Sequence, residues 1–264
     1  MDLKISGKTA LITGACGGIG LETARTLKAE GVKLILTDVD EDGLATSAQK
    51  LGGVEGTLAA DLTSENNISD LIRTCARHGG VDILVHTAGI TGAKGDPLEM
   101  TDEDWREAWE IDFMSSVRVA RQAVPEMVKK GWGRVVFITS ENAVQPYADE
   151  AVYNAAKAAL LNFTKCASMP YAKKGVLINA VSPAFIETDM TDGMMEKRAK
   201  EKGVSVQEAV QSFLKQERPF LTMERRGQPR EVAAVIALLC SDLASFVAGS
   251  AYRVDGGSVG AMNI

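Results

Sequence analysis

The stretch KTALITGACGGIGLETARTLKAEG, residues 8–31, joins an apolar run to an amphipathic segment through a glycine-rich turn. The apolar run stops at Gly14, which makes it too short for a helix and typical of a buried strand. After the turn, Ile19, Ala24 and Leu27 follow one another at helical spacing. We therefore expect a strand, a tight turn and a helix, in the order that begins a parallel α/β sheet.

The alternation of apolar runs and helical patterns continues through the rest of the chain. Further apolar runs occur at residues 32–38, 56–61, 81–89, 133–140, 176–183 and 250–257. Helical patterns occur at residues 66–80, 101–127, 151–175 and 230–242. Strands that are apolar throughout and alternate with helices indicate a parallel sheet covered on both faces. The sequence thus predicts a single α/β domain, residues 1–264, with a doubly wound, Rossmann-type, mostly parallel sheet of about seven strands.

One segment interrupts this rhythm, between the sixth expected strand and the helix that follows it. Residues 188–226 are too numerous for a plain connection, so they must contain helices of their own. The segment follows the carboxyl end of a strand, where open α/β sheets bind ligands, and we expect it to be a substrate lid. Its Met190, Met194 and Met195 fit an adaptable apolar pocket wall and ordinary packing equally well.

The composition argues against several classes of function. The chain of 264 residues has a formal net charge of -6 and no clustered basic face, so nucleic acid is not an expected partner. Its longest apolar runs, such as VAAVIALLC, are shorter than the roughly 18 residues of a membrane span. The first residues, MDLKISGKTALITG, lack the apolar core of a signal peptide.

The cysteine and histidine positions argue against disulfides and against a metal site. The four cysteines lie far apart in the sequence: Cys16, Cys75, Cys166 and Cys240. No C-x-x-C pair occurs, which favours a reducing compartment and a cytoplasmic protein. The two histidines, His78 and His86, fall in different expected elements, so we expect no bound metal.

The glycine-rich turn TGACGGIG, residues 13–20, has the spacing G-x-x-x-G-x-G. Gly14, Gly18 and Gly20 allow the backbone to turn tightly and to approach a diphosphate closely. The helix that follows offers free N–H groups and the positive end of its dipole to such an anion. A plain glycine-rich turn is the alternative, but the position between a strand and a helix favours a dinucleotide site.

Asp38 ends the second apolar run, 18 residues after Gly20. A carboxylate at this position accepts hydrogen bonds from ribose hydroxyl groups and repels a 2′-phosphate. Neither the glycine turn nor the segment DVDEDG, residues 38–43, contains a lysine or arginine that would bind such a phosphate. We therefore predict NAD(H) as the cofactor rather than NADP(H). A solvated aspartate at a strand end is the alternative.

A serine, a tyrosine and a lysine follow the fifth expected strand at a defined spacing. Ser140 ends the strand, Tyr153 follows thirteen residues later, and Lys157 lies one helical turn beyond. A free tyrosine has a pKa of about 10, and a cation one turn away lowers that pKa towards the value that a base requires. Ser140 would hydrogen-bond the oxygen on which charge develops. Tyr153 would remove a proton from an alcohol or return it to a ketone. The alternative is that Tyr153 and Lys157 are two ordinary surface side chains.

The glycine turn, Asp38 and the pattern Ser-x12-Tyr-x3-Lys together resemble the short-chain dehydrogenase/reductase family. The resemblance covers essentially the whole chain, with matching pieces DL at 61–62, AG at 88–89, INAVSP at 178–183 and VDGG at 254–257. It implies that Asp61 and Leu62 flank the adenine and that Ile186 and Thr188 contact the carboxamide end of nicotinamide. It implies that Lys157 holds the nicotinamide ribose as well as acting on Tyr153.

The residues expected to contact the cofactor are Gly14, Cys16, Gly18, Ile19, Gly20, Asp38, Val39, Asp61, Leu62, Thr87, Ala88, Gly89, Tyr153, Lys157, Pro183, Ala184, Ile186 and Thr188. The family resemblance also implies a homotetramer or a homodimer. The expected contact helices are residues 102–127 and 152–173, whose apolar stripe AALLNF fits packing on the chain's own sheet equally well.

The chain departs from the family pattern at three places. His86 and Thr87 replace two asparagines before Ala88 and Gly89, and Ala184 replaces a glycine. Thr87 still offers a hydrogen bond, and we expect His86 to be a core residue rather than a catalyst. The added methyl group of Ala184 is expected to change the local fit around the nicotinamide.

The third departure is Asp112, which stands where the family has an asparagine as its fourth catalytic residue. An ionised aspartate would place a negative charge near Lys157 and partly cancel its effect on the pKa of Tyr153. We expect a working proton relay with an alkaline-shifted pH optimum. A neutral or solvated Asp112 with little effect is the alternative.

Polar residues follow the predicted catalytic serine. Glu141, Asn142 and Gln145 favour a polar, hydroxylated small molecule, which we also expect Ser140 and Tyr153 to contact. The predicted function is that of an NAD-dependent oxidoreductase acting on a secondary alcohol or ketone. A reductase of 3-oxoacyl thioesters or ketones that uses NADPH, and a non-catalytic dinucleotide sensor, are alternatives. A methyltransferase is least favoured because it has no need of the tyrosine and lysine.

Overall fold

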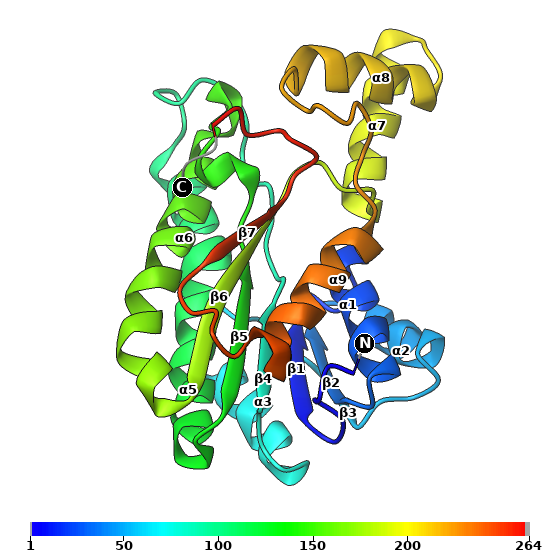
Figure 1. Ribbon diagram of the computed structural model, residues 1–264. Helices are drawn as coiled ribbons and strands as arrows, with labels where there is room; N and C mark the ends of the chain where they lie inside the picture. The colour runs from blue at the N-terminus through cyan, green and yellow to red at the C-terminus, as the bar shows by residue number, and fades with distance from the viewer. Residues whose placement is uncertain (1, 262–264) are drawn as a thin grey trace.

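The computed structural model describes residues 2–261, which form an α/β unit around a seven-stranded sheet (Figure 1). The strands are β1 (Thr9–Thr13), β2 (Lys33–Asp38), β3 (Gly56–Ala59), β4 (Ile83–His86), β5 (Gly133–Ile138), β6 (Val176–Pro183) and β7 (Ala251–Val254). Their spatial order is β3-β2-β1-β4-β5-β6-β7, and all neighbouring pairs run parallel. The chain turns from one half of the sheet to the other between β1 and β4, which confirms the predicted doubly wound fold.

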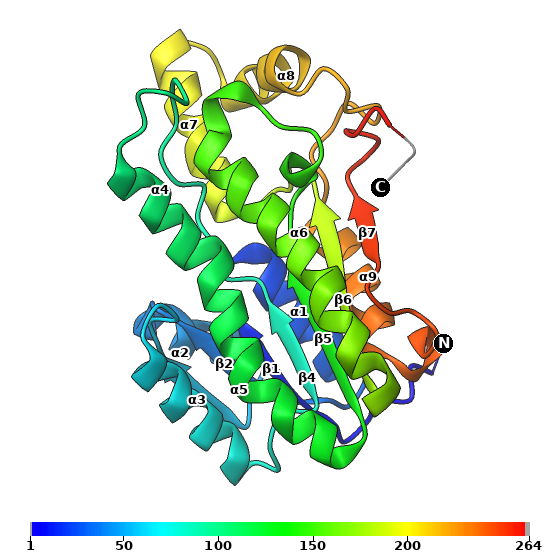
Figure 2. The same ribbon diagram turned by 90° about the vertical axis from the view of Figure 1, so that its left-hand side faces the viewer.

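Helices cover both faces of the sheet. They are α1 (Gly18–Ala29), α2 (Glu41–Lys50), α3 (Glu65–Arg77), α4 (Asp102–Trp109), α5 (Ser115–Lys130), α6 (Ala151–Tyr171), α7 (Asp189–Lys202), α8 (Val206–Glu217) and α9 (Pro229–Cys240). Helices α1, α2 and α9 lie on one face, whereas α3, α5 and α6 lie on the other (Figures 1 and 2). None of the helices within residues 2–261 has the length and apolar character needed to cross a membrane.

The strands are apolar throughout because neighbouring residues point into two different cores. In β1, Leu11 belongs to the core under α3, α5 and α6, and Ile12 belongs to the core under α1 and α9. In β4, Leu84 and Val85 divide in the same way. Side chains alternate across a strand, so a sheet covered on both faces needs an apolar residue at every position.

Helix α2 is the helix that the hydrophobic pattern does not predict. Its sequence is EDGLATSAQK, and only Leu44 and Ser47 are buried. The helix begins after Asp40, whose side chain accepts a hydrogen bond from the N–H of Gly43. The cap and the connection between β2 and β3 therefore stabilise a helix that has almost no apolar face.

The long helix predicted at residues 101–127 is present, but a π-helical turn interrupts it. Helix α4 ends at Trp109, the π turn spans Glu110–Met114, and α5 continues from Ser115. A π turn contains an extra residue, and such turns are frequent at functional sites. Here the turn contains Asp112, which is fully buried.

Residues 188–226 contain α7 and α8, which stand beyond the carboxyl ends of the strands (Figure 1). The two helices have a small apolar core of their own, formed by Phe185, Met195, Phe213, Leu214 and Leu221. Thr188 caps α7 by accepting a hydrogen bond from the N–H of Thr191. The segment is therefore an ordered helical insertion above the sheet.

Two neighbouring leucines of α9 provide a test of the packing. Leu239 is buried and Leu238 is 38% exposed. We expect Leu239→Ala to lower the free energy of unfolding by about 2–5 kcal/mol, because it leaves a cavity in the core. Leu238→Ala should cost less than about 1 kcal/mol, because its side chain is partly in water. Urea denaturation, monitored by circular dichroism, measures the free energy of unfolding of both variants. Equal losses of this free energy would contradict the packing described for α9.

Candidate active site

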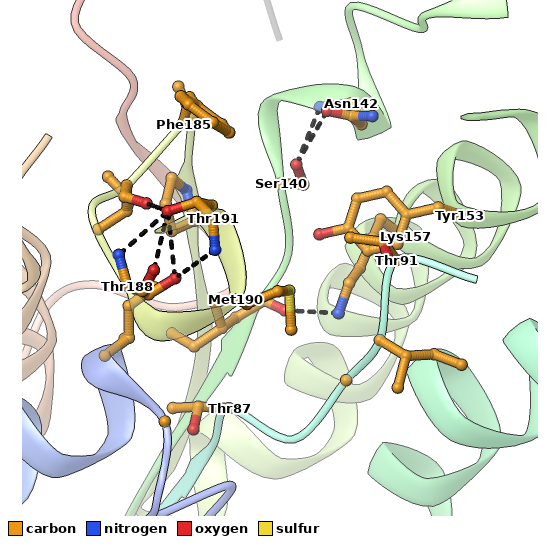
Figure 3. A pocket seen from close by; sticks show the side chains of 18 of the residues that line it. Thr87, Thr91, Ser140, Asn142, Tyr153, Lys157, Phe185, Thr188, Met190 and Thr191 are labelled. Carbon is orange, nitrogen blue, oxygen red and sulfur yellow. Dashed lines mark hydrogen bonds between the residues drawn. The ribbon is translucent and has the colours of Figure 1, made fainter. Parts of the chain in front are cut away.

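A cavity of about 230 Å³ lies between the carboxyl ends of the strands and the helical insertion (Figure 3). It is lined by most of the predicted site residues: Gly14, Gly18, Ile19, Gly20, Thr87, Gly89, Asp112, Ser140, Glu141, Asn142, Tyr153, Lys157, Pro183, Ala184, Ile186 and Thr188. In Figure 3, Ser140, Tyr153 and Lys157 lie on one side, opposite Thr188 and Thr191. Parallel strands bring these residues together because their carboxyl ends share one edge of the sheet.

Gly14, Gly18 and Gly20 of the turn have no room for a side chain. A Cβ atom on Gly20 would lie 2.3 Å from the carbonyl oxygen of Gly14, and one on Gly18 would lie 2.9 Å from a methyl group of Thr188. Gly14 has a φ of 60°, which also favours glycine. The backbone of the turn therefore borders the cavity directly at the N-terminus of α1, and this arrangement fits the diphosphate of a dinucleotide.

Thr87 supports the glycine turn from the end of β4. Its hydroxyl group lies 2.6 Å from the carbonyl oxygen of Thr13, to which it donates a hydrogen bond, and 3.2 Å from that of Gly14. The hydrogen-bonding role expected for this threonine is therefore present. His86 is buried, its ring nitrogens lie 3.1 Å from the hydroxyl groups of Thr13 and Ser115, and burial lowers its pKa to about 3. It is a neutral core residue, as expected.

Asp38 lies beside the turn, at the end of β2. One carboxylate oxygen accepts the N–H of Cys16 at 3.0 Å, and the other accepts the N–H of Val39 at 2.8 Å. These contacts fix the carboxylate where the glycine turn meets the loop after β2. Burial and the charge of Asp38 raise the pKa of the Cys16 thiol to about 11, so Cys16 is a neutral neighbour of this site.

Seven of the predicted residues do not line the cavity within the described part of the chain: Cys16, Asp38, Val39, Asp61, Leu62, Ala88 and Gln145. The first three lie together beside the turn, and Val39 is largely exposed. The carboxylate of Asp61 binds the backbone and hydroxyl of Thr63, whereas the side chain of Leu62 is buried in the core. Only the backbone of Leu62 is therefore available to a ligand.

Lys157 and Tyr153 meet as their spacing on α6 predicts. The ammonium nitrogen of Lys157 is buried and lies 5.5 Å from the centroid of the Tyr153 ring. It donates a hydrogen bond to the carbonyl oxygen of Ile138 at 3.3 Å. Burial raises the pKa of Tyr153 above its usual value, the charge of Asp112 raises it further, and a hydrogen bond with Ser140 opposes both.

Asp112 forms a direct ion pair with Lys157. Its Oδ1 lies 3.2 Å from the ammonium nitrogen and also accepts the N–H of Ile90 at 3.1 Å. Its Oδ2 is buried and has no hydrogen-bond partner within residues 2–261. Burial raises the pKa of Asp112, and the charge of Lys157 opposes this. A Cβ atom on Gly89 would lie 2.5 Å from Oδ1, so the family's glycine is required here.

Sequence reasoning missed four charged residues that line the cavity: Lys94, Glu150, Asp189 and Arg218. Glu150 lies one turn before Tyr153 along the chain, and this proximity is a sequence clue that was available. Arg218 gives no such clue, because only the folding of α8 brings it to the site. Met190 and Met194 line the cavity, whereas Met195 packs inside the insertion.

Comparisons with known proteins agree with this geometry. A family profile described as Enoyl-(Acyl carrier protein) reductase matches residues 14–259. The 3-oxoacyl-(acyl-carrier-protein) reductase of Aquifex aeolicus is 34% identical over 262 residues, which cover 97% of this chain and 99% of that protein.

Two solved structures are similar over nearly their full length. The L-sorbose reductase of Gluconobacter frateurii, complexed with NADPH and L-sorbose, has a TM-score of 0.93 and 34% identity over 99% of this chain and 100% of its own. A variant of actinorhodin polyketide ketoreductase with NADPH has a TM-score of 0.87 and 34% identity over 95% of this chain and 97% of its own. Because profile, sequence and structure all match over nearly the whole chain, this protein belongs to the short-chain dehydrogenase/reductase family.

Proposed function

We propose that this protein is a nicotinamide-dinucleotide-dependent oxidoreductase that interconverts a secondary alcohol and a ketone. The observation that carries the proposal is that Ser140, Tyr153 and Lys157 line the same cavity as the glycine turn. A bound dinucleotide would supply or accept the hydride. The backbone of the turn would hold its diphosphate, and Lys157 and Thr188 border the part of the cavity that its nicotinamide end would need.

The chain itself supplies positioning and proton transfer. The hydroxyl group of Ser140 lies on the cavity wall and would hydrogen-bond the reacting oxygen. In alcohol oxidation Tyr153 removes the proton from that oxygen, and in ketone reduction it returns the proton. The buried ammonium group of Lys157, 5.5 Å from the centroid of the Tyr153 ring, would stabilise the phenolate form of Tyr153.

NAD(H) is the proposed dinucleotide, although both structural relatives described above were solved with NADPH. The support is Asp38, whose carboxylate is held beside the glycine turn by two backbone N–H groups. A negative charge there favours ribose hydroxyls and repels a 2′-phosphate. No lysine or arginine occurs in residues 13–20 or 38–43 to offset it.

A polar ketone or alcohol is the proposed substrate. Glu141 and Asn142 line the cavity beside Ser140, and the similar reductase from Gluconobacter frateurii was solved in complex with the sugar L-sorbose. A 3-oxoacyl thioester is the second candidate, because the Aquifex relative is named as a reductase of such thioesters. Both candidate substrates need the same proton transfer. They differ in the groups attached to the reacting carbon and therefore in the side chains that would bind those groups.

Removal of the Tyr153 hydroxyl group tests the reaction. We expect Tyr153→Phe to lower kcat by about 10²–10⁴-fold, because no other group on this wall replaces its proton transfer. Binding of the dinucleotide, followed by nicotinamide fluorescence, should change little. Tyr252→Phe, on a partly exposed tyrosine of β7, is the matched control and should retain activity. Full activity of Tyr153→Phe would contradict the assigned role.

Cofactor preference tests the role of Asp38. Titration with NADH and NADPH should give a Kd at least about tenfold lower for NADH, since charged hydrogen bonds contribute this much. Asp38→Ser should bring the two Kd values close together. Asp42→Ser, which removes an exposed carboxylate of the same segment, should leave the preference intact. Tighter NADPH binding by the unaltered protein would show that Asp38 does not exclude the phosphate.

The pH dependence tests the ion pair of Asp112. Alcohol oxidation requires deprotonated Tyr153, so its rate rises with pH as Tyr153 loses its proton. The charge of Asp112 raises the pKa of Tyr153, and Asp112→Asn should therefore move the rising part of the profile to lower pH by about one unit. Glu107→Gln, which removes an exposed charge from α4, should not move it. Superimposable profiles for Asp112→Asn and the parent protein would mean that Asp112 is uncharged.

A further inference from the structure

A cluster of charged side chains forms the cavity wall next to Ser140. Glu141, Glu150 and Arg218 are each less than a tenth exposed, and Lys94 lies at its edge. Two carboxylates face two cations, so the cluster has no excess charge that would select an anionic substrate. Buried charges are costly unless they are paired, which makes the pairing of each group informative.

Glu150 is fully engaged by protein groups. Both of its oxygens lie 3.1 Å from one guanidinium nitrogen of Arg218. Lys94 and Asn142 each donate a further hydrogen bond to it at 2.6 Å. Although burial opposes ionisation, the charges of Arg218 and Lys94 keep the pKa of Glu150 below its usual value. The ionised form of Glu150 is therefore favoured, and it holds Arg218 in place.

Arg218 is held but not saturated. Its guanidinium group stacks 3.6 Å from the centroid of the Tyr147 ring, which fixes its plane. Its Nε is buried and finds no hydrogen-bond acceptor among the residues that the structure describes. The nearest carboxylate oxygen in an ion pair with this nitrogen is Oε1 of Glu141, at 3.7 Å. This distance is too long for a hydrogen bond.

Glu141 is the complementary group. Its Oε2 accepts a hydrogen bond from the hydroxyl group of Ser140 at 2.9 Å. Its Oε1 faces Arg218 across the 3.7 Å separation, and both residues line the cavity. Burial raises the pKa of Glu141 to about 7, and Arg218 opposes this. An acceptor and a donor thus stand side by side, next to the serine that would bind the reacting oxygen.

A hydroxyl group matches this pair, because it accepts one hydrogen bond and donates another. When Glu141 is ionised, a carbonyl or ether oxygen would satisfy only Arg218, and a carboxylate would be repelled by Glu141. An alkyl group would leave a buried donor without a partner, and such a site rejects substrates that lack the matching group. The acyl chain of a thioester would bring no donor to Glu141.

We propose that Glu141 and Arg218 bind a substrate hydroxyl group on the carbon beside the reacting carbon, which makes the substrate a neutral hydroxyketone or the corresponding diol. This assignment rests on the proposed oxidoreductase function and names its substrate class. The position follows from Ser140, because Glu141 touches the same hydroxyl group that would hold the reacting oxygen.

Two ketones that differ by one hydroxyl group test the proposal: 3-hydroxy-2-butanone and 2-butanone. For the unaltered protein we expect kcat/KM to be at least roughly 100-fold higher for the hydroxyketone. Arg218→Lys keeps a charge for Glu150 but removes the Nε donor, and Glu141→Gln removes the charged acceptor. Each should lower the ratio of the two kcat/KM values at least about tenfold, mainly through loss on the hydroxyketone.

The controls separate recognition from structure. Arg225→Gln removes a partly exposed arginine that pairs with Glu231 outside this cavity, and it should leave the ratio unchanged. Thermal unfolding and dinucleotide binding show whether each variant is folded. If Glu141→Gln does not fold, the result for Arg218→Lys alone decides the test. Equal losses on both ketones in the folded variants would overturn the proposal, since the pair would then merely support Ser140.

Measurements on the unaltered protein distinguish failure of the hydroxyl site from failure of the oxidoreductase function. The hydroxyl site would be overturned by a ratio of the two kcat/KM values near one. It would also be overturned if S-acetoacetyl-N-acetylcysteamine were reduced faster than the hydroxyketone. Either result would still support the oxidoreductase function. Dinucleotide binding without reduction of any of the three compounds would defeat the proposed function itself, and the hydroxyl site with it.

Discussion

The buried ammonium group of Lys157 is the charge around which this site is arranged. It binds the carboxylate of Asp112 in the π turn and the carbonyl oxygen of Ile138 at the end of β5. Through Asp112 it reaches the N–H of Ile90 in the loop after β4. A buried cation needs partners, so one charge connects α6, β5, the π turn and that loop. The positions of Tyr153 and Ser140 depend on the same elements.

The pairing of Lys157 with Asp112 has two opposing effects. The carboxylate compensates a charge that would be costly to bury alone, and removal of one partner of a buried pair is strongly destabilising. The same negative charge raises the pKa of Tyr153, whereas the role that we propose for Lys157 is to lower it. The family's asparagine would avoid this conflict. This chain combines a more complete pairing of the lysine with a tyrosine that is less readily deprotonated.

The wall on the other side of Ser140 uses charge for recognition instead. Arg218 comes from the end of α8, and the small apolar core of the insertion determines where that end lies. Glu150 and Tyr147 then hold the guanidinium group against the cavity. The proposed proton transfer thus depends on the sheet and α6, whereas the proposed recognition pair joins Glu141, directly after β5, to Arg218 from the insertion.

Local patterns in the sequence determine the doubly wound sheet, the glycine turn and the spacing of Ser140, Tyr153 and Lys157. Strand and helix periods are properties of neighbouring residues, and two side chains four apart on a helix share a face wherever the helix lies. These patterns do not predict helix α2, because its stability comes from a cap rather than an apolar face. Tertiary packing alone decides that Asp112 turns inward to meet Lys157 and that Arg218 reaches Glu141 and Glu150 from another part of the chain. Those contacts join residues far apart in the sequence, and no local spacing specifies them.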